Sequence, residues 1–406
     1  MPSRRQLLAG FGSTAAAGLS GCLGGINVSE SDFTPGTDED ADWPMPRYDS
    51  TNAAYNPDAK APREGVAERW TYERGMATGT PAIADGTAFL PTSQGLVALD
   101  ATTGEEVWRY SPNEHGWTTP PVVHDGTVYA SESSRSGVSA LDAETGDEIW
   151  SNPDPGDSRA GVHLLAGEHV SDPVLYAGGE NGEVFRLDAA TGETTWQTDL
   201  FGEISAFGFH FGGLYVGTYG GEIYSFTDTV DGVDEPGEGW RRKVGSAVRT
   251  ILPDEECVLV HTFGGPLRCI QSGAHAGTTR WQMDSADANS APVHAEYSFF
   301  SAGYERLSAV REYDKKTEWQ LDGRYDATGP VAAGDTLYVS DRDGVHAFKL
   351  GGGTGAFGHR FDAKRWSHPT PGGTSEGLAV ADGAVFAATQ GSEDSDVTLY
   401  CLESPN

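Results

Sequence analysis

The sequence has few lysines, few cysteines and few segments apolar enough to enter a membrane. Only six of its 27 basic residues are lysine, and 60 acidic residues give a formal net charge of −33. The lack of a basic stripe disfavours nucleic-acid binding, because nothing in the chain would neutralise phosphates. The apolar stretch over about residues 7–19 is too short to span a bilayer comfortably and is expected to be a removable signal.

Recurrent metal-binding spacings are absent as well. The 11 histidines show no H-x-H or H-E-x-x-H spacing and the four cysteines no C-x-x-C pair, so the sequence predicts no metal site and no catalytic residue. The acidic runs 38–40 and 394–396 resemble calcium-binding loops only superficially and are expected to be solvated surface. The acidic, lysine-poor composition is typical of proteins that stay soluble in concentrated salt. We therefore expect a halophilic, archaeal source, with a surface made for a cationic partner as the alternative.

The first 22 residues are predicted to be an export signal. Arg4 and Arg5 precede a short apolar region, which resembles a twin-arginine signal. The following Leu-Ser-Gly-Cys fits a lipobox, in which cleavage leaves Cys22 as a lipid-modified N-terminus; the alternative is that Cys22 is a small residue in an uncleaved anchor. Residues 23–42 are polar and expected to form a flexible acidic tether. The protein is thus expected to be exported and anchored by lipid to the outer face of the cytoplasmic membrane.

A repeat of about 40 residues fills the remainder of the chain. Its clearest copies read L-D-A-x-T-G-x-x-x-W and end at Trp108, Trp150 and Trp196. The closing tryptophan recurs with weaker surroundings at Trp240, Trp281 and Trp319; Trp70 precedes the first copy, and His359 stands where the seventh should end. Together with 54 glycines, this period is typical of β-propeller blades, each a four-stranded sheet. The seven tryptophans are predicted to pack the blades together.

Two further observations set the number of blades at eight. The third strand of each copy carries a small residue, which gives a column of Ala98, Ala140, Arg186, Ser225, Cys269, Ala309, Ala347 and Cys401, with Arg186 as the exception. The last copy stops without an outer strand, while a strand around Trp70 precedes the first copy without a blade. We therefore predict an all-β fold over residues 43–406: an eight-bladed β-propeller of four-stranded antiparallel blades, closed by the N-terminal strand.

The L-D-A-x-T-G-x-x-x-W signature, together with the lead-in at residues 42–49 and 56–57, resembles the PQQ-repeat, quinoprotein-type eight-bladed propellers. This superfamily includes the pyrroloquinoline-quinone (PQQ) dehydrogenases and the propeller lipoprotein of the bacterial barrel-assembly machine. The resemblance implies the fold, but its motif residues pack blades rather than perform chemistry. In the dehydrogenases a disulfide between adjacent cysteines lies beside the quinone, and no Cys-Cys dipeptide occurs here. The resemblance therefore implies no cofactor for this chain.

Three cysteines lie outside the signal. Cys257 and Cys269 flank a hairpin turned at residues 264–265, and export would permit a disulfide between them. Cys269 and Cys401 both fall in the small-residue column, which favours buried free thiols. The sequence leaves both alternatives open, with the free thiols preferred.

A binding site is expected where loops surround a mouth of the channel. In most copies of the repeat, small residues come just before the innermost strand. Larger or charged residues occur in or near this region at Trp117, Arg159, His163, His210 and Arg249. These five are candidates to bind an anionic or peptide ligand, with ordinary loop variation as the alternative. The leading interpretation is a non-catalytic, monomeric cell-surface scaffold that binds a protein, peptide or envelope polymer. The alternative is a PQQ-dependent quinoprotein oxidoreductase.

Overall fold

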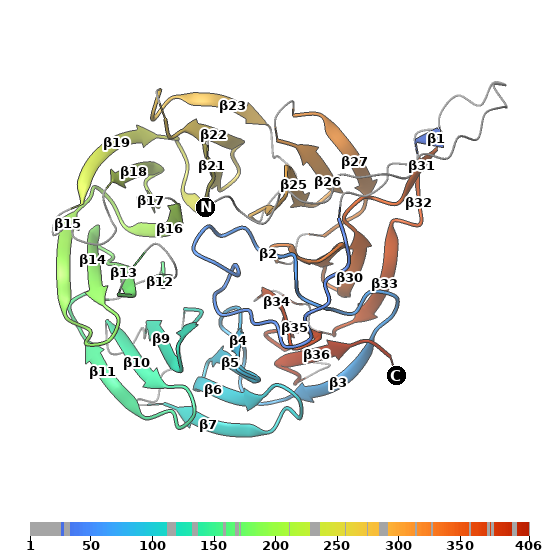
Figure 1. Cartoon of the computed structure of the whole chain (residues 1–406), viewed down its shortest axis with the longest axis horizontal. Coiled ribbons are helices and arrows are strands. Elements are labelled where there is room, and N and C mark those ends of the chain that lie inside the picture. The colour runs from blue at the N-terminus through green and yellow to red at the C-terminus, as the bar shows by residue number, and fades with distance from the viewer. Residues whose placement is uncertain are drawn as a thin grey trace, which may run out of the picture.

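A ring of small antiparallel sheets makes up the described part of the chain (Figure 1). The computed structural model describes residues 26–27, 33–111, 119–131, 137–156, 160–166, 170, 172–210, 212–227, 236–255, 257–273, 275–283, 291–312, 315–325, 328–356, 359–371, 374, 377–391 and 396–405. Every regular element within these ranges is a β-strand, so they hold no helix that could cross a membrane. Eight sheets surround a central axis, which confirms the predicted eight-bladed propeller.

Blades 1 to 4 follow one another along the chain, and each runs from an innermost to an outermost strand. Blade 1 consists of β4 (Ala82–Ala84), β5 (Thr87–Thr92), β6 (Gly95–Asp100) and β7 (Glu106–Tyr110). Blade 2 consists of β8 (Val122–His124), β9 (Thr127–Ser131), β10 (Val138–Asp142) and β11 (Glu148–Asn152). Blade 3 consists of β12 (Val162–Leu165), β13 (Val174–Gly178), β14 (Glu183–Asp188) and β15 (Thr194–Asp199). Blade 4 consists of β16 (Ile204–His210), β17 (Gly213–Thr218), β18 (Glu222–Thr227) and β19 (Gly237–Lys243).

Blades 5 to 7 continue this order, and blade 8 joins the two ends of the chain. Blade 5 consists of β20 (Val248–Pro253), β21 (Cys257–Thr262), β22 (Leu267–Gln271) and β23 (Thr279–Met283). Blade 6 consists of β24 (Val293–Ala295), β25 (Ser298–Ala302), β26 (Arg306–Arg311) and β27 (Thr317–Asp322). Blade 7 consists of β28 (Val331–Ala333), β29 (Thr336–Ser340), β30 (Gly344–Lys349) and β33 (Lys364–Pro369), with β2 (Tyr55–Asn56) added parallel to β28. Blade 8 consists of β34 (Gly377–Ala381), β35 (Ala384–Ala388), β36 (Leu399–Glu403) and β3 (Ala67–Tyr72).

The ring closes through blade 8 as predicted. Strand β3 pairs antiparallel with β36, and Trp70 lies opposite Cys401 in this register. An N-terminal strand thereby covers the edge that the C-terminal strand would otherwise expose. The first and last parts of the propeller are held in one sheet (Figure 1).

Burial differs between the middle and the outer strands of a blade. All five residues of β29 are buried, because both faces of a middle strand pack against neighbouring blades. In the outermost strand β15, partly buried residues alternate with exposed ones. The core is therefore formed between blades, near the middle of each sheet.

The small-residue column and the tryptophans form one repeated pair. Each column residue lies opposite a tryptophan of the outermost strand, and the pairs are Ala98–Trp108, Ala140–Trp150, Arg186–Trp196, Ser225–Trp240, Cys269–Trp281, Ala309–Trp319, Ala347–Trp366 and Cys401–Trp70. A β-bulge interrupts the register beside every pair. A bulge increases the local twist of the strand that carries it.

The seventh tryptophan position was assigned to His359, and this prediction is wrong. The residue opposite Ala347 is Trp366. The backbone of His359 belongs to β32 (His359–Phe361), which pairs with β31 (Thr354–Ala356) in a hairpin inserted between β30 and β33. Strand β1 (Ile26–Asn27) also pairs with β31. The inserted hairpin moves the outermost strand of blade 7 further along the sequence. Trp366 therefore falls outside the spacing of about 40 residues that the other tryptophans follow.

The L-D-A-x-T-G signature connects each of blades 1, 2 and 3 to the blade before it. In blade 1 the Asp100 carboxylate accepts a hydrogen bond of 2.7 Å from the Thr103 N–H, which lowers the pKa of Asp100. The turn places Gly104 so close to Trp70 of blade 8 that a Cβ would lie 2.6 Å from the indole. Trp70 Nε1 donates to Ala101 O at 2.9 Å. The same indole bond recurs from Trp108 to Ala143, from Trp150 to Ala189 and from Trp319 to Leu350.

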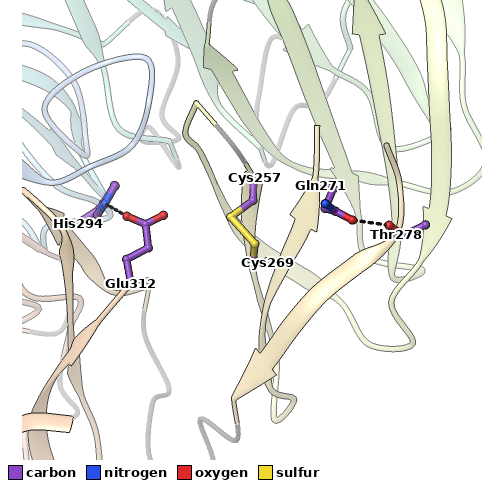
Figure 2. The surroundings of a disulfide bond; sticks show 6 residues. All are labelled: Cys257, Cys269, Gln271, Thr278, His294 and Glu312. Carbon is purple, nitrogen blue, oxygen red and sulfur yellow. Dashed lines mark hydrogen bonds and ion pairs between the residues drawn. A yellow bond between two sulfur atoms is a disulfide. The ribbon is translucent and has the colours of Figure 1, made fainter. Parts of the chain in front are cut away.

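Cys257 and Cys269 form a disulfide, so the preference for free thiols at these positions is wrong (Figure 2). The two residues lie on the adjacent strands β21 and β22, and their Cα atoms are 5.6 Å apart, within the usual range for a disulfide. Cys269 pairs with Leu259 rather than with Cys257, so the disulfide links the strands diagonally. Cys401 is a buried free thiol, as expected.

Candidate binding site at the open mouth of the channel

The segment of residues 41–56, which we call the plug, lies across the centre of the ring (Figure 1). Its prolines, Pro44 and Pro46, have no backbone N–H and cannot complete the ladder of a central strand. The chain turns tightly instead, and the Ala54 N–H donates to Arg47 O at 3.0 Å. The plug is thus a folded loop seated in the channel.

The plug is hydrogen-bonded to the innermost strand of every blade or to the turn that ends it. From blade 1 to blade 8, the plug residues and their partners are Trp43 with Ile83, Pro44 with Val123, Ser50 with His163 and Phe209, Asn52 with Phe207 and Ile251, Ala53 with His294, Ala54 with Ala332, and Ala41 with Asp382. An innermost strand has one edge without a neighbouring strand, and its unpaired backbone groups need partners. The plug supplies such partners around the axis.

The two faces of the ring differ. We call one face the plug face: it carries the turn between the first and second strand of each blade. In blade 1, Asp42 of the plug accepts a 3.1 Å hydrogen bond from the Asp85 N–H in this turn. We call the opposite side the open face: it carries the turn between the second and third strand of each blade and the segments that link one blade to the next. On this side the plug residues Met45, Arg47 and Asn52 contribute to a cavity of about 190 Å³. The volume is below the roughly 300 Å³ of a typical small-molecule pocket, so the cavity suits one large side chain or a small ligand group.

His163, a predicted site residue, lines this cavity but is bonded to the plug. Its side chain is buried, and Nε2 lies 3.1 Å from Ser50 O. Burial lowers the pKa of His163 to about 4, although the bond to Ser50 favours the protonated form. The ring is therefore neutral at pH 7, and its Nε2–H donates to the Ser50 carbonyl. This geometry makes His163 a support for the plug.

Arg249, a second predicted site residue, lines the cavity and is exposed on the open face. Its guanidinium lies 5.0 Å from the ring centroid of Phe263 and 6.0 Å from that of Tyr219. These distances are in the range of cation–π contacts. Phe263 is itself 60% exposed at the turn between β21 and β22. Arg249 thus presents a charge held against an exposed aromatic surface.

Similar arginine–aromatic pairs occur elsewhere on the open face. The open rim consists of three such pairs, Arg241 with Phe201, Arg249 with Phe263 and Arg324 with Tyr304. All three aromatic side chains are exposed. Exposed aromatic residues next to arginine are the composition that protein–protein interfaces favour.

The other predicted site residues do not join this cavity within the described structure. His210 ends β16 on the plug face, opposite Gly213, and does not line the cavity. Trp117 and Arg159 lie outside the described residues, as do Arg4, Arg5 and Cys22.

Arg47 is a residue of the site that the sequence did not single out. Its Nε donates to Asn52 O at 2.9 Å and its Nη2 donates to Pro292 O of blade 6. Burial lowers the pKa of Arg47 to about 10, which leaves it protonated at neutral pH. The available signal was an arginine directly after Pro46, in a lead-in that belongs to no repeat.

Eight blades closed by the N-terminal strand, with L-D-A-x-T-G turns packed on tryptophans, define a PQQ-repeat propeller. The family model described as outer membrane protein assembly factor BamB matches residues 58–203 and 134–358. These matches cover more than half of the chain, and the chain belongs to this family. No curated protein sequence matches it.

Solved structures show the same fold at low sequence identity. Quinohemoprotein alcohol dehydrogenase from Comamonas testosteroni is 14% identical over 90% of this chain and 82% of its own, with a TM-score of 0.61. BamB from Moraxella catarrhalis is 14% identical over 83% of this chain and 99% of its own, with a TM-score of 0.58. A europium-containing methanol dehydrogenase is 11% identical over 87% of this chain and 90% of its own, with a TM-score of 0.61. At these identities the likeness shows the fold alone.

Proposed function

We propose that the protein is a non-catalytic cell-surface scaffold that binds an exported polypeptide at its open face. The plug carries this proposal. Because residues 41–56 are bonded to all eight blades, the protein's own chain occupies the position on the axis where a propeller can hold a ligand. On the open face, a partner can reach the open rim and the small cavity beside it.

The chemistry of the open rim supports a polypeptide as the partner. Exposed aromatic rings offer apolar area, and the paired arginines offer donors to carboxylates and backbone carbonyls. The family's description as an assembly factor also supports a role in handling other proteins. An envelope polymer is the other partner to be distinguished by experiment.

Export and lipid anchoring belong to the same proposal. The twin arginines Arg4 and Arg5 would direct export, and lipid on Cys22 would hold the propeller at the outer face of the cytoplasmic membrane. The R4K/R5K variant is expected to leave precursor in the cytoplasm. The C22S variant is expected to appear in the soluble fraction; its continued membrane association would show that the apolar segment is the anchor.

The proposed binding face is tested by crosslinking in intact cells. The membrane-attached wild type and an R249A/F263A variant are crosslinked in high salt, purified and analysed by mass spectrometry. Tyr297→Ala is the matched control, because Tyr297 is 72% exposed on the plug face, in the turn between β24 and β25. We expect R249A/F263A, but not Y297A, to lose most crosslinked polypeptide. Undiminished crosslinking of R249A/F263A would contradict the proposal, as would capture of glycan alone.

The alternative function, a PQQ-dependent oxidoreductase, is tested on the purified protein. The likeness of the fold to those of an alcohol dehydrogenase and a methanol dehydrogenase is the observation that favours this alternative. PQQ and Ca²⁺ are added, and quinone absorbance is followed together with dye-linked oxidation of alcohols and sugars. Stoichiometric quinone uptake with turnover would overturn the scaffold proposal.

A further inference from the structure

Three metal-ligating side chains from two neighbouring blades meet beside the plug. Asp254 follows β20 in blade 5, His294 lies on β24 of blade 6, and Glu312 follows β26 of the same blade. One ligand atom from each lies within 4.8 Å of the other two. Ligands bound at about 2.0–2.2 Å lie roughly 3–4 Å apart, so small side-chain movements would close the triad around an ion.

His294 brings an unsatisfied nitrogen to this cluster. Figure 2 shows its ring and the Glu312 carboxylate pointing toward one another, with 3.4 Å between Nε2 and Oε2. Nε2 is buried, and no hydrogen-bond partner for it exists among the described residues. The ring is held by stacking on Phe299, with 4.7 Å between centroids. Apart from this 3.4 Å contact with Glu312, the nitrogen has no partner among the described residues. A buried polar atom without a hydrogen bond is costly, and a metal ion would bind it.

The donor set defines the class of ion. We propose that Asp254, His294 and Glu312 bind a divalent transition-metal ion, for which Zn²⁺ is the best match. Zn²⁺ is bound by imidazole nitrogen and carboxylate oxygen, with water able to fill the fourth position. Two carboxylates balance its charge. Ca²⁺ prefers six to eight oxygen ligands, more than these carboxylates supply.

The backbone around the triad gives the ion a structural role. The Asp254 N–H donates to Cys257 O, beside the disulfide of blade 5, and the His294 N–H donates to Ala53 O of the plug. The Glu312 N–H donates to Tyr297 O within blade 6. The ion would therefore cross-link blades 5 and 6 next to the plug. The ligands are 40 and 18 residues apart in the sequence, so no local motif shows them.

The test compares Zn²⁺ binding by matched variants. EDTA-treated protein is titrated with ZnCl₂ by calorimetry, with excess Mg²⁺ present to occupy the acidic surface. His294→Gln removes the proposed nitrogen ligand. His368→Gln is the control, because His368 Nε2 lies 3.0 Å from Glu68 and its side chain is 14% exposed, against 15% for His294. No third ligand joins the His368 pair within the described structure.

We expect one Zn²⁺ per wild-type chain, unchanged affinity in H368Q, and at least about tenfold weaker binding in H294Q, since even indirect supports of a metal site are worth 10–100-fold. Zn²⁺ should also raise the unfolding temperature of wild type and H368Q but not of H294Q, because it stabilises only the state that binds it. Circular dichroism checks the fold, and D254N repeats the test if H294Q does not fold. Equal Zn²⁺ binding by wild type and the ligand variants, or none by wild type, would overturn the proposal.

Discussion

A single glycine shows how the repeat signature joins two blades. Gly146 has a φ of +74°, and a Cβ added there would lie 2.7 Å from the indole of Trp108 in the preceding blade. The indole Nε1 also donates to Ala143 O in the same turn. The glycine of the signature is therefore required twice, for its backbone conformation and for the approach of the ring.

The two requirements can be separated with a matched pair of substitutions. Gly126 has nearly the same φ, +72°, but a Cβ there would meet nothing within 4 Å. Gly126→Ala should lower the free energy of unfolding by about 1 kcal/mol, the cost of the backbone conformation. Gly146→Ala should lower the free energy of unfolding by a further ~1–3 kcal/mol, because the added methyl group would overpack against Trp108. Urea unfolding measures both, and equal losses would show that the contact with Trp108 costs nothing.

His163 makes stability depend on pH. Its pKa is lowered by burial from 6.5 to about 4, so the unfolded chain takes up a proton at a higher pH than the folded protein. The stability from the neutral ring is complete above pH 6.5 and is lost as the pH falls from 6.5 to 4. At about 1.4 kcal/mol per pH unit, the loss is on the order of 3 kcal/mol.

The measurement is urea unfolding of wild type and H163Q at pH 7, 5.5 and 4.5. The acidic residues titrate in both proteins, so the difference between them reports His163. We expect the stability advantage of wild type to shrink as the pH falls. Parallel curves would mean that the ring is not held neutral.

At the scale of elements, the plug depends on one side chain that bridges two blades. Asn52 Nδ2 donates to Phe207 O at 2.7 Å and to Ile251 O at 2.9 Å. Its φ of +60° is one that glycine adopts freely, so Asn52→Gly removes the two bonds without adding backbone strain. Two partly buried carbonyls would then lack a partner, at about 1–3 kcal/mol each.

We expect the loss of these two hydrogen bonds to increase local opening of the plug while the blades of the ring stay folded. Hydrogen exchange should accelerate at the His294 and Ala332 amides, which donate to Ala53 and Ala54 of the plug. The amides between β5 and β6, far from the axis, serve as the internal control and should not change. Unchanged exchange at His294 and Ala332 in N52G would show that the plug is held without Asn52.

The sequence predicted those elements whose residues repeat. The tryptophan period, the small-residue column and the unpaired strand around Trp70 led to eight blades and to the closure, because each copy faces the same packing problem. Trp366 was missed because the hairpin of β31 and β32 breaks the period. The disulfide was only the less favoured alternative, because the column describes a position in one strand, whereas a disulfide depends on the diagonal neighbour in the next strand.

The site was less predictable because its contacts run across the axis. His163 and Arg249 stood out as unusual residues at strand entries, and both line the cavity. Nothing in the local sequence indicates that His163 binds Ser50 of the plug, 113 positions away. The same holds for Asp254, His294 and Glu312, which meet only when two blades pack. Such sites depend on long-range geometry rather than on local pattern.

At the scale of the whole molecule, the dominant property is the net charge of −33 on 406 residues. The 27 basic residues are too few to pair with all 60 acidic residues. Many carboxylates on the folded surface therefore have no basic partner and repel one another. The repulsion is greater in the compact folded state than in the expanded chain. Salt weakens it, because the Debye length falls from about 10 Å at 0.1 M to about 3 Å at 1 M.

We therefore expect the urea midpoint of unfolding to rise continuously as NaCl increases from 0.1 to 1 M. Screening depends on ionic strength, so KCl at the same concentrations should give nearly the same rise. A rise limited to NaCl would instead indicate specific ion binding to the acidic surface. A midpoint that falls or stays constant would contradict the assignment of the charge to life in concentrated salt, and would favour an acidic surface made for a cationic partner.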